Sequence, residues 1–490
     1  MGLFDGLARR LGYVPARRSA AAGFQMAQQS RLLNDWILSP TTADQNIRRD
    51  LRSLRNRSRD LAENEVYLRR FFNMLLRNVI GPQGIRLAMN VRQDDGKPDE
   101  DANRRIEEAW QRWGRAGICT SCGTLSWWEV ERLVLQSVAR DGDMLLRHDF
   151  ATRVNDFRYA LQLLEGDQLD HELNEERRDG RRIKLGVEVN ANGRPVAYHL
   201  LRRHPGEMYG HDLGSRHDRV PAELIIHPFV RYRVTQTRGV PWVVATGKIL
   251  KHLEGYQEAA VVAARAGASK MGFIEQEAGG DYTEGREKDD LGRTIEEVEP
   301  GILEALPPGA KFAAFDPGYP DGDFGDFVKA ILRGVSCGLD VSYASLAGDL
   351  SDANYSSMRE GKGEEHDAWR SLQRWLIIKL HQPVAEQWLR MAILTGQVNL
   401  PVGKLPKFMA GIEWRPRGWA PVDEKKAAEA NESGLRNRTA TREQIASAAG
   451  RDWREDMRQL KREQDFAEEL GLREPAPATA PPPAAPSEED

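Results

Sequence analysis

The amino-acid sequence predicts a mostly helical α+β fold in which the strands cluster in one domain. Apolar residues recur every three, four or seven positions from Leu51 to Val79, which is the spacing of one helix face. Between residues 144 and 201 the pattern changes to short apolar runs separated by turn residues, which indicates strands. Alanine-rich and apolar stretches at 248–269 and 323–338 favour helices again. Helices around a strand-rich segment are typical of the α+β class.

Length and charge restrict the possible partners. The 490 residues are enough for roughly three domains of about 150 residues each. Lys and Arg number 70 and Asp and Glu number 74, and the net charge of −4 lacks the basic excess of a protein that grips phosphates tightly. No run approaches the roughly 18 apolar residues of a membrane span. We therefore expect no membrane partner, and only a loose or transient contact with any DNA.

The N-terminal region divides into an arm and a long helix. Residues 1–47 are rich in Arg and small residues without strong periodicity, and we expect a flexible arm there. The following helix ends at the breaker pair Gly81-Pro82. It carries a cluster of arginines that we interpret as a solvated or subunit-facing surface, with a DNA-facing stripe as the alternative. The cluster consists of Arg48, Arg49, Arg52, Arg55, Arg57 and Arg59.

An α+β domain is expected over residues 101–240. Two helices come first, and Ser126 and Glu129 form a capping box at the start of the second. The sequence Asn-Ala-Asn-Gly at 190–193 predicts a hairpin turn between two strands. The expected elements are helices 101–113 and 126–140 and strands 144–150, 159–164, 185–189 and 196–201.

The second half is predicted to be helical apart from one polar excursion at 275–323. Pro383 should kink or break the long helix that contains it. The Pro/Ala-rich acidic end, 474–490, is expected to be disordered. The expected elements are helix 248–269, strand 311–315, helix 323–338, a turn-rich stretch 340–357, a long helix through Leu380, and charged helices 423–435 and 441–470.

Four patterns resemble catalytic or metal sites without their context. The GxSxG pattern at 334–338 follows a helix, whereas a hydrolase nucleophile follows a strand. Gly361-Lys362 resembles the end of a Walker A loop, but Gly363 stands where Ser or Thr is needed. Cys119 and Cys122 lack a second cysteine pair. Four histidines lack helical zinc spacing: His204, His211, His217 and His227. We expect no enzyme activity, no cofactor and no metal.

Several segments, in order along the chain, resemble the lambda-type phage portal proteins. The stretch from Ser342 to Met358, SYASLAGDLSDANYSSM, is the most specific of them. The resemblance extends over about residues 3–470. The other segments are RSRDLA at 57–62, NVIG at 78–81, LQLLEGDQLD at 161–170, GRPVAYH at 193–199 and RGVPW at 238–242.

The resemblance implies the portal fold, with wing, stem, clip and crown, and it assigns each part of the chain to that plan. The flexible arm is 1–47 and the acidic tail 474–490. The parts between them are the wing 48–245, first stem helix 246–270, clip 271–322, second stem helix 323–338, tunnel loop 339–357, wing and crown helices 358–420, and C-terminal crown helices 421–473.

The resemblance also implies a function and partners. The family forms a homo-oligomeric ring, a dodecamer, at one capsid vertex of the virion, assembled in the host cytoplasm. Double-stranded DNA is packaged through it by the terminase large subunit and later ejected. Further expected partners are the major capsid or scaffold protein and a head–tail connector protein. The candidates for DNA contact in the channel are Lys248, Lys251, Arg265, Lys270, Ser345, Asp349, Asp352, Asn354 and Tyr355.

Two other interpretations remain open from the sequence. Another non-catalytic virion protein, such as a head–tail connector or minor capsid protein, would not need residues 248–337 in the form of two helices around an excursion. A helical enzyme would need a deep pocket with a catalytic constellation that the motifs do not reveal.

Lysines and arginines of the stem are equally candidates for salt bridges between neighbouring stems.

Overall fold

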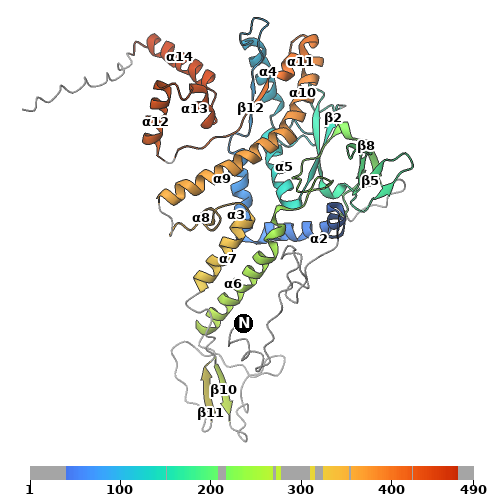
Figure 1. Ribbon diagram of the computed structural model, residues 1–490, viewed down its shortest axis with the longest axis vertical. Helices are drawn as coiled ribbons and strands as arrows, with labels where there is room; N and C mark the ends of the chain where they lie inside the picture. The colour runs from blue at the N-terminus through green and yellow to red at the C-terminus, as the bar shows by residue number, and fades with distance from the viewer. Residues whose placement is uncertain are drawn as a thin grey trace, which may run out of the picture. The chain divides into compact units, whose positions relative to one another are not determined.

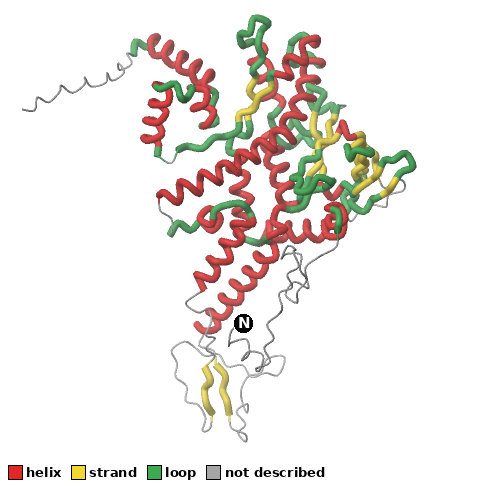
Figure 2. The backbone as a smooth tube through the Cα atoms, in the orientation of Figure 1, coloured by secondary structure: helices red, strands yellow, loops and turns green. Residues whose placement is uncertain are grey.

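The computed structural model describes residues 40–150, 152–207, 217–268, 272–276, 310–314, 324–351, 355–421 and 423–472. The chain divides into two compact units at residue 42, and the account below concerns the second unit, Ala43–Asp490. Its arrangement of helices and strands is drawn in Figures 1 and 2. The expected α+β class is confirmed, because helices and several antiparallel sheets occur together.

Two consecutive helices open this unit: α2 (Ala43–Asn64) and α3 (Val66–Leu75), which continues as a π-helical turn, η3 (Leu76–Ile80). The predicted apolar stripe is buried, with Leu51, Leu68 and Val79 each 0% exposed. The Glu65 carboxylate accepts a hydrogen bond from the Leu68 amide and caps α3. Helix α2 begins inside the segment 1–47 that the sequence assigned to a flexible arm.

Helices α4 (Glu100–Trp113) and α5 (Trp127–Asp141) pack on a tryptophan-rich core. The predicted capping box of Ser126 and Glu129 is present at the start of α5. The Trp110 and Trp113 rings lie 5.0 Å apart between centroids, and each lies 5.0–6.3 Å from the rings of Trp127 and Trp388. These aromatic contacts join the first half of the chain to its second half.

The strands form small antiparallel sheets. Strands β2, β3, β6 and β7 confirm the four predicted runs within a few residues, and β6 and β7 pair across the predicted 190–193 turn. One sheet has the order β3-β2-β9, and a five-stranded sheet follows the sequence order from β4 to β8. The bounds are β2 (Met144–Asp149), β3 (Ala160–Glu165), β4 (Glu175–Glu176), β5 (Arg182–Lys184), β6 (Val187–Val189), β7 (Pro195–Leu201), β8 (His217–Pro221) and β9 (Ile225–Ile226).

Two helices, α6 (Gly247–Ala268) and α7 (Phe324–Gly338), pack against each other. In Figure 1 they run side by side, and two strands lie beyond their far ends. These strands, β10 (Gly272–Gln276) and β11 (Ala310–Ala314), pair antiparallel, with Gly272 opposite Ala314. The two predicted helices are therefore present and the predicted strand at 311–315 is β11, whereas most of the predicted excursion 275–323 lies outside the described residues.

The second half continues with a short helix, α8 (Tyr343–Ala347), and a long one, α9 (Tyr355–Leu376). Ser342 caps α8, which lies inside the stretch that the sequence read as turns. The predicted effect of Pro383 takes the form of a π-helical turn, η7 (Ile377–His381), before α10 (Gln382–Leu394) begins. Proline has no amide hydrogen and therefore fits the first turn of α10.

The remaining elements return to the N-terminal half and then end in three charged helices. After α11 (Leu405–Ala410), strand β12 (Ile412–Arg415) pairs antiparallel with β1 (Arg86–Met89). Helices α12 (Glu424–Arg436), α13 (Arg442–Ala448) and α14 (Trp453–Glu469) follow, and Gly450, at a φ of +71°, lies between the last two. Among the described helices, none is long and apolar enough to cross a membrane.

Candidate functional site

Two of the segments that carry the family resemblance, 161–170 and 238–242, meet around one buried carboxylate, Asp143. Arg55 of α2 donates to Asp143 Oδ1 through Nη2 and to the Asp141 carbonyl through Nε. Arg238 donates to Asp143 Oδ2 through Nε at 2.6 Å. Arg55, Asp143 and Arg238 are at most 1% exposed. We call these three residues, with Asp167 and His227, the Asp143 cluster.

The hydrogen bonds of Arg238 tie several loops to this cluster. Its Nη2 donates to the Gly166 carbonyl at 2.6 Å, and its Nη1 donates to the carbonyls of Leu169 at 3.0 Å and Leu185 at 3.3 Å. The guanidinium thus bonds the segment 161–170 and the loop before β6 at once. A buried arginine is stable only when its donors find partners in this way.

Electrostatics keep the Asp143 carboxylate ionised. Burial opposes the charge of Asp143, but Arg238 and Arg55 outweigh it and hold the pKa of this carboxyl well below its usual range. The His227 imidazole, 3% exposed, lies 3.2 Å from Asp143 Oδ2, and burial lowers its pKa. Arg55 also lies 3.5 Å from Asp167. Asp143, Arg55 and Arg238 therefore hold opposite charges in fixed positions away from solvent, whereas Asp167 is 19% exposed.

Two glycines of these segments are required by the close packing at the cluster. A Cβ on Gly166 would overlap the Asp143 carboxylate and the Arg55 guanidinium. A Cβ on Gly239 would overlap the backbone of Gly142. The glycines in the segments 161–170 and 238–242 thus have a packing role, which explains why these short motifs contain them.

The predicted channel residues of α6 lie on its exposed surface. Lys248, Lys251 and Arg265 are all exposed. Lys251 forms an ion pair at 3.0 Å with Glu254 on the same helix, with the two side chains 62% and 38% exposed. The pair is local to one chain and solvent-exposed, so it contributes little to stability and leaves the lysine accessible.

Aromatic contacts hold α6 against α7. The Tyr256 ring stacks on Phe324 at 5.4 Å and lies 4.9 Å from Phe327, between centroids. At the other end of the pair, Thr246 packs so closely on Gly338 that a Cβ there would overlap its side chain. Val261, Val262 and Phe327 remain 49–58% exposed, so the described residues leave these apolar side chains of the helix pair largely uncovered.

The predicted tunnel-loop residues bond within their own chain. The Ser345 hydroxyl donates to Glu365 of α9 at 3.0 Å, and its carbonyl accepts from Arg70 of α3 at 2.7 Å. Asp349 accepts from the hydroxyls of Ser351 and Tyr343, and these hydrogen bonds, the one from Ser351 foremost, lower its pKa to about 2. The structure therefore assigns Ser345 and Asp349 a part in bracing the segment between α7 and α9.

The other predicted channel residues are not placed by the structure. Lys270, Asp352 and Asn354 lie outside the described residues. Tyr355 is the first residue of α9, and its backbone alone is described. Their contact with DNA therefore stays a prediction.

Comparison with known proteins decides the family. A family model described as phage portal protein, lambda family, matches residues 29–373. The probable portal protein of Halomonas phage phiHAP-1 is 35% identical over 462 residues, which cover 91% of this chain and 89% of that protein. The chain belongs to the lambda family of phage portal proteins.

More distant relatives of this portal protein agree with that assignment in sequence. Portal protein B of Escherichia phage lambda is 22% identical over 421 residues, which cover 77% of this chain and 76% of that protein. Among solved structures, a chain in the neck of an empty GTA particle computed with C6 symmetry has a TM-score of 0.42 and 15% identity. That alignment covers 86% of this chain and 94% of the neck chain.

The patterns that resemble enzyme or metal sites have structural positions in this portal protein. Ser336 of the GxSxG pattern lies inside α7, where its hydroxyl donates to the Arg333 carbonyl at 2.8 Å. Gly361-Lys362 lies inside α9. Cys119 and Cys122 are free thiols, and burial raises the pKa of Cys119 to about 12.

Of the four histidines that the sequence brings together, the three described ones face separate carboxylates. His204 lies 3.2 Å from Glu165, His217 lies 2.7 Å from Asp170, and His227 faces Asp143. His211 lies outside the described residues. Glu165, Asp167 and His204 have ligand atoms within 4.8 Å of one another, but Arg59 pairs with both of these carboxylates. The Arg59 guanidinium supplies the positive charge that a metal ion would otherwise supply to these two carboxylates.

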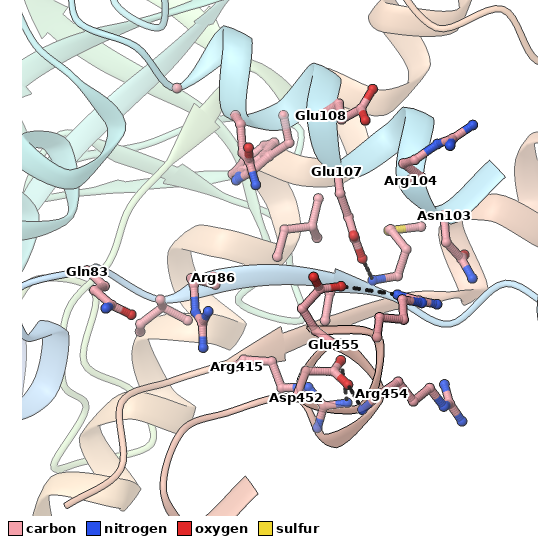
Figure 3. A pocket seen from close by; sticks show the side chains of 18 of the residues that line it. Gln83, Arg86, Asn103, Arg104, Glu107, Glu108, Arg415, Asp452, Arg454 and Glu455 are labelled. Atoms are coloured by element: carbon pink, nitrogen blue, oxygen red, sulfur yellow. Dashed lines mark hydrogen bonds and ion pairs between the residues drawn. The ribbon is translucent and has the colours of Figure 1, made fainter. Parts of the chain in front are cut away.

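A cleft of about 960 Å³ lies between α4, β1 and the start of α14. Its wall carries six arginines and seven carboxylates, many of which are drawn in Figure 3. Opposite charges pair across and along it: Arg458 with Glu100, and Arg462 with Glu455 at 2.8 Å. The Glu107 carboxylate accepts from the Met89 amide at 2.7 Å. These charges neutralise one another rather than forming a field of one sign.

Sequence reasoning missed the role of Arg55 and did not single out Asp143. The arginine cluster on α2 was interpreted as a surface, yet Arg55 is buried and Arg59 is half-buried against Asp141 and Asp167. A signal was present in the spacing: Arg55 follows the buried Leu51 by four positions, on the same face of the helix. Asp143 follows α5 directly, after Gly142, with no periodicity to mark it.

Proposed function

We propose that the chain forms a ring at one vertex of a phage head, through which double-stranded DNA is packaged and later ejected. Membership of the lambda portal family carries this proposal. The helix pair α6/α7 supports it, because its exposed apolar surface fits contacts between identical neighbours. A dodecamer is the expected ring. Its site of action is the virion, after assembly in the host cytoplasm.

DNA passes along α6 in this proposal, with Lys248, Lys251 and Arg265 as candidate contacts. The net charge of −4 favours transit over capture, because each phosphate that is neutralised adds to binding and would hold the duplex in place. A terminase motor supplies the work, and the terminase large subunit, the capsid or scaffold protein and a head–tail connector are the proposed partners. The portal itself acts without catalysis.

Negative-stain electron microscopy of the purified full-length protein tests the ring. The proposal expects end-on views of about twelve subunits around a channel wide enough for duplex DNA. Monomers or dimers at micromolar concentration would contradict it and favour another virion protein or an enzyme. One subunit more or fewer would not decide the question.

A matched pair of variants tests the part of α6 in the ring. Val261→Glu places a charge at a position that is 58% exposed and is expected to face a neighbour, so rings should be lost or reduced. Val402→Glu makes the same change at a position 51% exposed outside the helix pair, and rings should persist. Equal effects of both changes would contradict a stem made of α6 and α7.

A further inference from the structure

Helix α2 carries its exposed arginines before its exposed carboxylates along the chain. Arg48, Arg49, Arg52 and Arg57 are exposed in its first fifteen residues, whereas the exposed Asp60 and Glu63 stand in its last five. The helix dipole acts within the first and last turns, where Asp44 stands in the first turn and the arginines follow it, so the dipole does not account for this order. The order instead gives α2 a basic half and an acidic end on its exposed surface.

A braced loop extends the basic half of α2. Thr237 donates to Asp44 Oδ1 through its amide at 2.9 Å and its hydroxyl at 3.0 Å, which ties the loop to the start of α2. The buried Gln236 side chain accepts from the Tyr232 amide at 3.0 Å. Tyr232 and Val234 nevertheless project outward, 65% and 90% exposed. We call Arg48, Arg52, Arg231, Tyr232 and Val234 the basic end.

The opposite end of α2 has the complementary chemistry. Asp60 and Glu63 are exposed there beside Val66, which is 67% exposed at the start of α3. Helix α6 packs on α2 and adds the exposed Glu258. We call Asp60, Glu63, Val66 and Glu258 the acidic end.

The basic end thus combines exposed apolar side chains with an excess of arginine, although Glu172 lies 3.7 Å from Arg48. The acidic end combines Val66 with an excess of carboxylates, although Lys251 lies among them and pairs with Glu254. Apolar side chains surrounded by complementary charges are typical of a protein interface.

The two ends cannot meet within one chain. Arg48 and Glu63 are fifteen residues apart on one helix, which places them about 22 Å apart along its axis. Two different complementary surfaces at opposite ends of one element suit a head-to-tail contact, which closes into a ring when each copy is rotated relative to the last. A contact of an end with its own copy would place like charges together.

We propose that the basic end of α2 docks onto the acidic end of the neighbouring copy of this chain. The docked surfaces bury Tyr232 and Val234 near Val66 and place Arg48 and Arg52 opposite Asp60 and Glu63. This inference rests on the proposed ring and names one contact that closes it.

Charge exchange between the two ends tests the contact in the full-length protein. One variant carries Arg48→Glu and Arg52→Glu, a second carries Asp60→Arg and Glu63→Arg, and a third carries all four changes. Ring formation is followed by analytical ultracentrifugation over a range of protein concentrations at two salt concentrations. Arg436→Glu with Arg442→Glu, on the C-terminal helices, reverses two other exposed arginines and serves as the matched control.

Each two-residue variant is expected to need about tenfold more protein for half-assembly, because like charges then face each other. The four-residue variant should recover assembly, since the charges are opposite again. The changed side chains are exposed, and so is the Arg48–Glu172 pair that the first variant loses, so thermal unfolding of the monomer should change little. A loss of assembly in a chain that is no less stable separates docking from misfolding.

Three outcomes would overturn the contact. Rings that form at the wild-type concentration in both two-residue variants would remove it while leaving the portal function intact. Failure of the four-residue variant to recover, or an equal loss in the control, would show that bulk charge rather than this pairing matters. Wild-type protein that stays monomeric at every concentration would overturn both the contact and the proposed ring.

Discussion

The Asp143 cluster and the C-terminal helices α12–α14 use charge in opposite ways. In the cluster, Arg55, Asp143 and Arg238 are at most 1% exposed, and their polar atoms bond one another and backbone carbonyls. On α12, the Arg436–Glu432 pair is 75% and 71% exposed, and α14 contributes no buried residue. Both regions are rich in ion pairs, yet they differ in whether water can replace a lost partner.

That difference teaches where charge determines structure in this portal protein. A buried guanidinium that loses its carboxylate cannot bind water instead, so separating the two groups is costly. The cluster therefore fixes the relative positions of α2, β2 and the 161–170 segment. An exposed pair that is broken exchanges one partner for water and changes little. The stability of the C-terminal helices therefore comes from caps such as Thr441 and from the contacts of their apolar side chains rather than from exposed ion pairs.

The largest effect is expected from Asp143→Asn. The change keeps the shape but removes the charge that compensates Arg55 and Arg238, and it turns an amide toward their donors. The free energy of unfolding should fall by about 3–5 kcal/mol, measured by chemical denaturation. Asp218→Asn, whose partner Arg202 is exposed, is the control and should cost less than about 1 kcal/mol. Similar losses in both would break the contrast between buried and exposed charge.

Gly239→Ala should come next. The added Cβ meets the Gly142 backbone, which cannot move without shifting the Asp143 cluster, so we expect a loss of about 3 kcal/mol. Gly363→Ala is the matched change, because its Cβ enters open space inside α9. It should stabilise the protein by up to about 1 kcal/mol through helix propensity. A neutral Gly239→Ala would show that the two segments do not need their close approach.

The buried His148 predicts a pH dependence of intermediate size. Burial lowers its pKa from 6.5 to about 4, so the unfolded chain binds the proton first as the pH falls. Stability is therefore complete above about pH 6.5 and declines from there toward pH 4, by about 2 kcal/mol at pH 5 from this group. Denaturation of the wild type and His148→Asn at pH 7.5 and pH 5 measures it. The variant should lose less stability between the two pH values, and an equal loss would assign the dependence to other groups.

The smallest effect is expected from Arg436→Ala. Its pair with Glu432 is exposed and local to α12, so the free energy of unfolding should change by less than about 0.5 kcal/mol. A thermal melt compared with the wild type is sufficient. A larger loss would mean that α12 depends on this pair, and it would weaken the comparison with the Asp143 cluster.

Sequence alone predicted the local elements of this protein and several of their ends. The Ser126–Glu129 capping box, the 190–193 hairpin turn, the alanine-rich α6 and the irregular helical turn before Pro383 all follow from interactions among residues close in the chain. The family resemblance also came from short segments in a fixed order, and the comparisons bear it out.

Tertiary structure alone decided which charges are buried and which distant segments meet. In the local pattern, Arg55 differs from its exposed neighbours on α2 only in the face of the helix on which it lies. That face is buried because Asp143 and Arg238, from distant parts of the chain, pack against it in the folded protein. The pairing of β1 with β12 and the bonds of Ser345 to Arg70 and Glu365 are of the same kind. Local periodicity reports the environment of one element, whereas a buried ion pair or a sheet between distant strands is determined by packing of the whole chain.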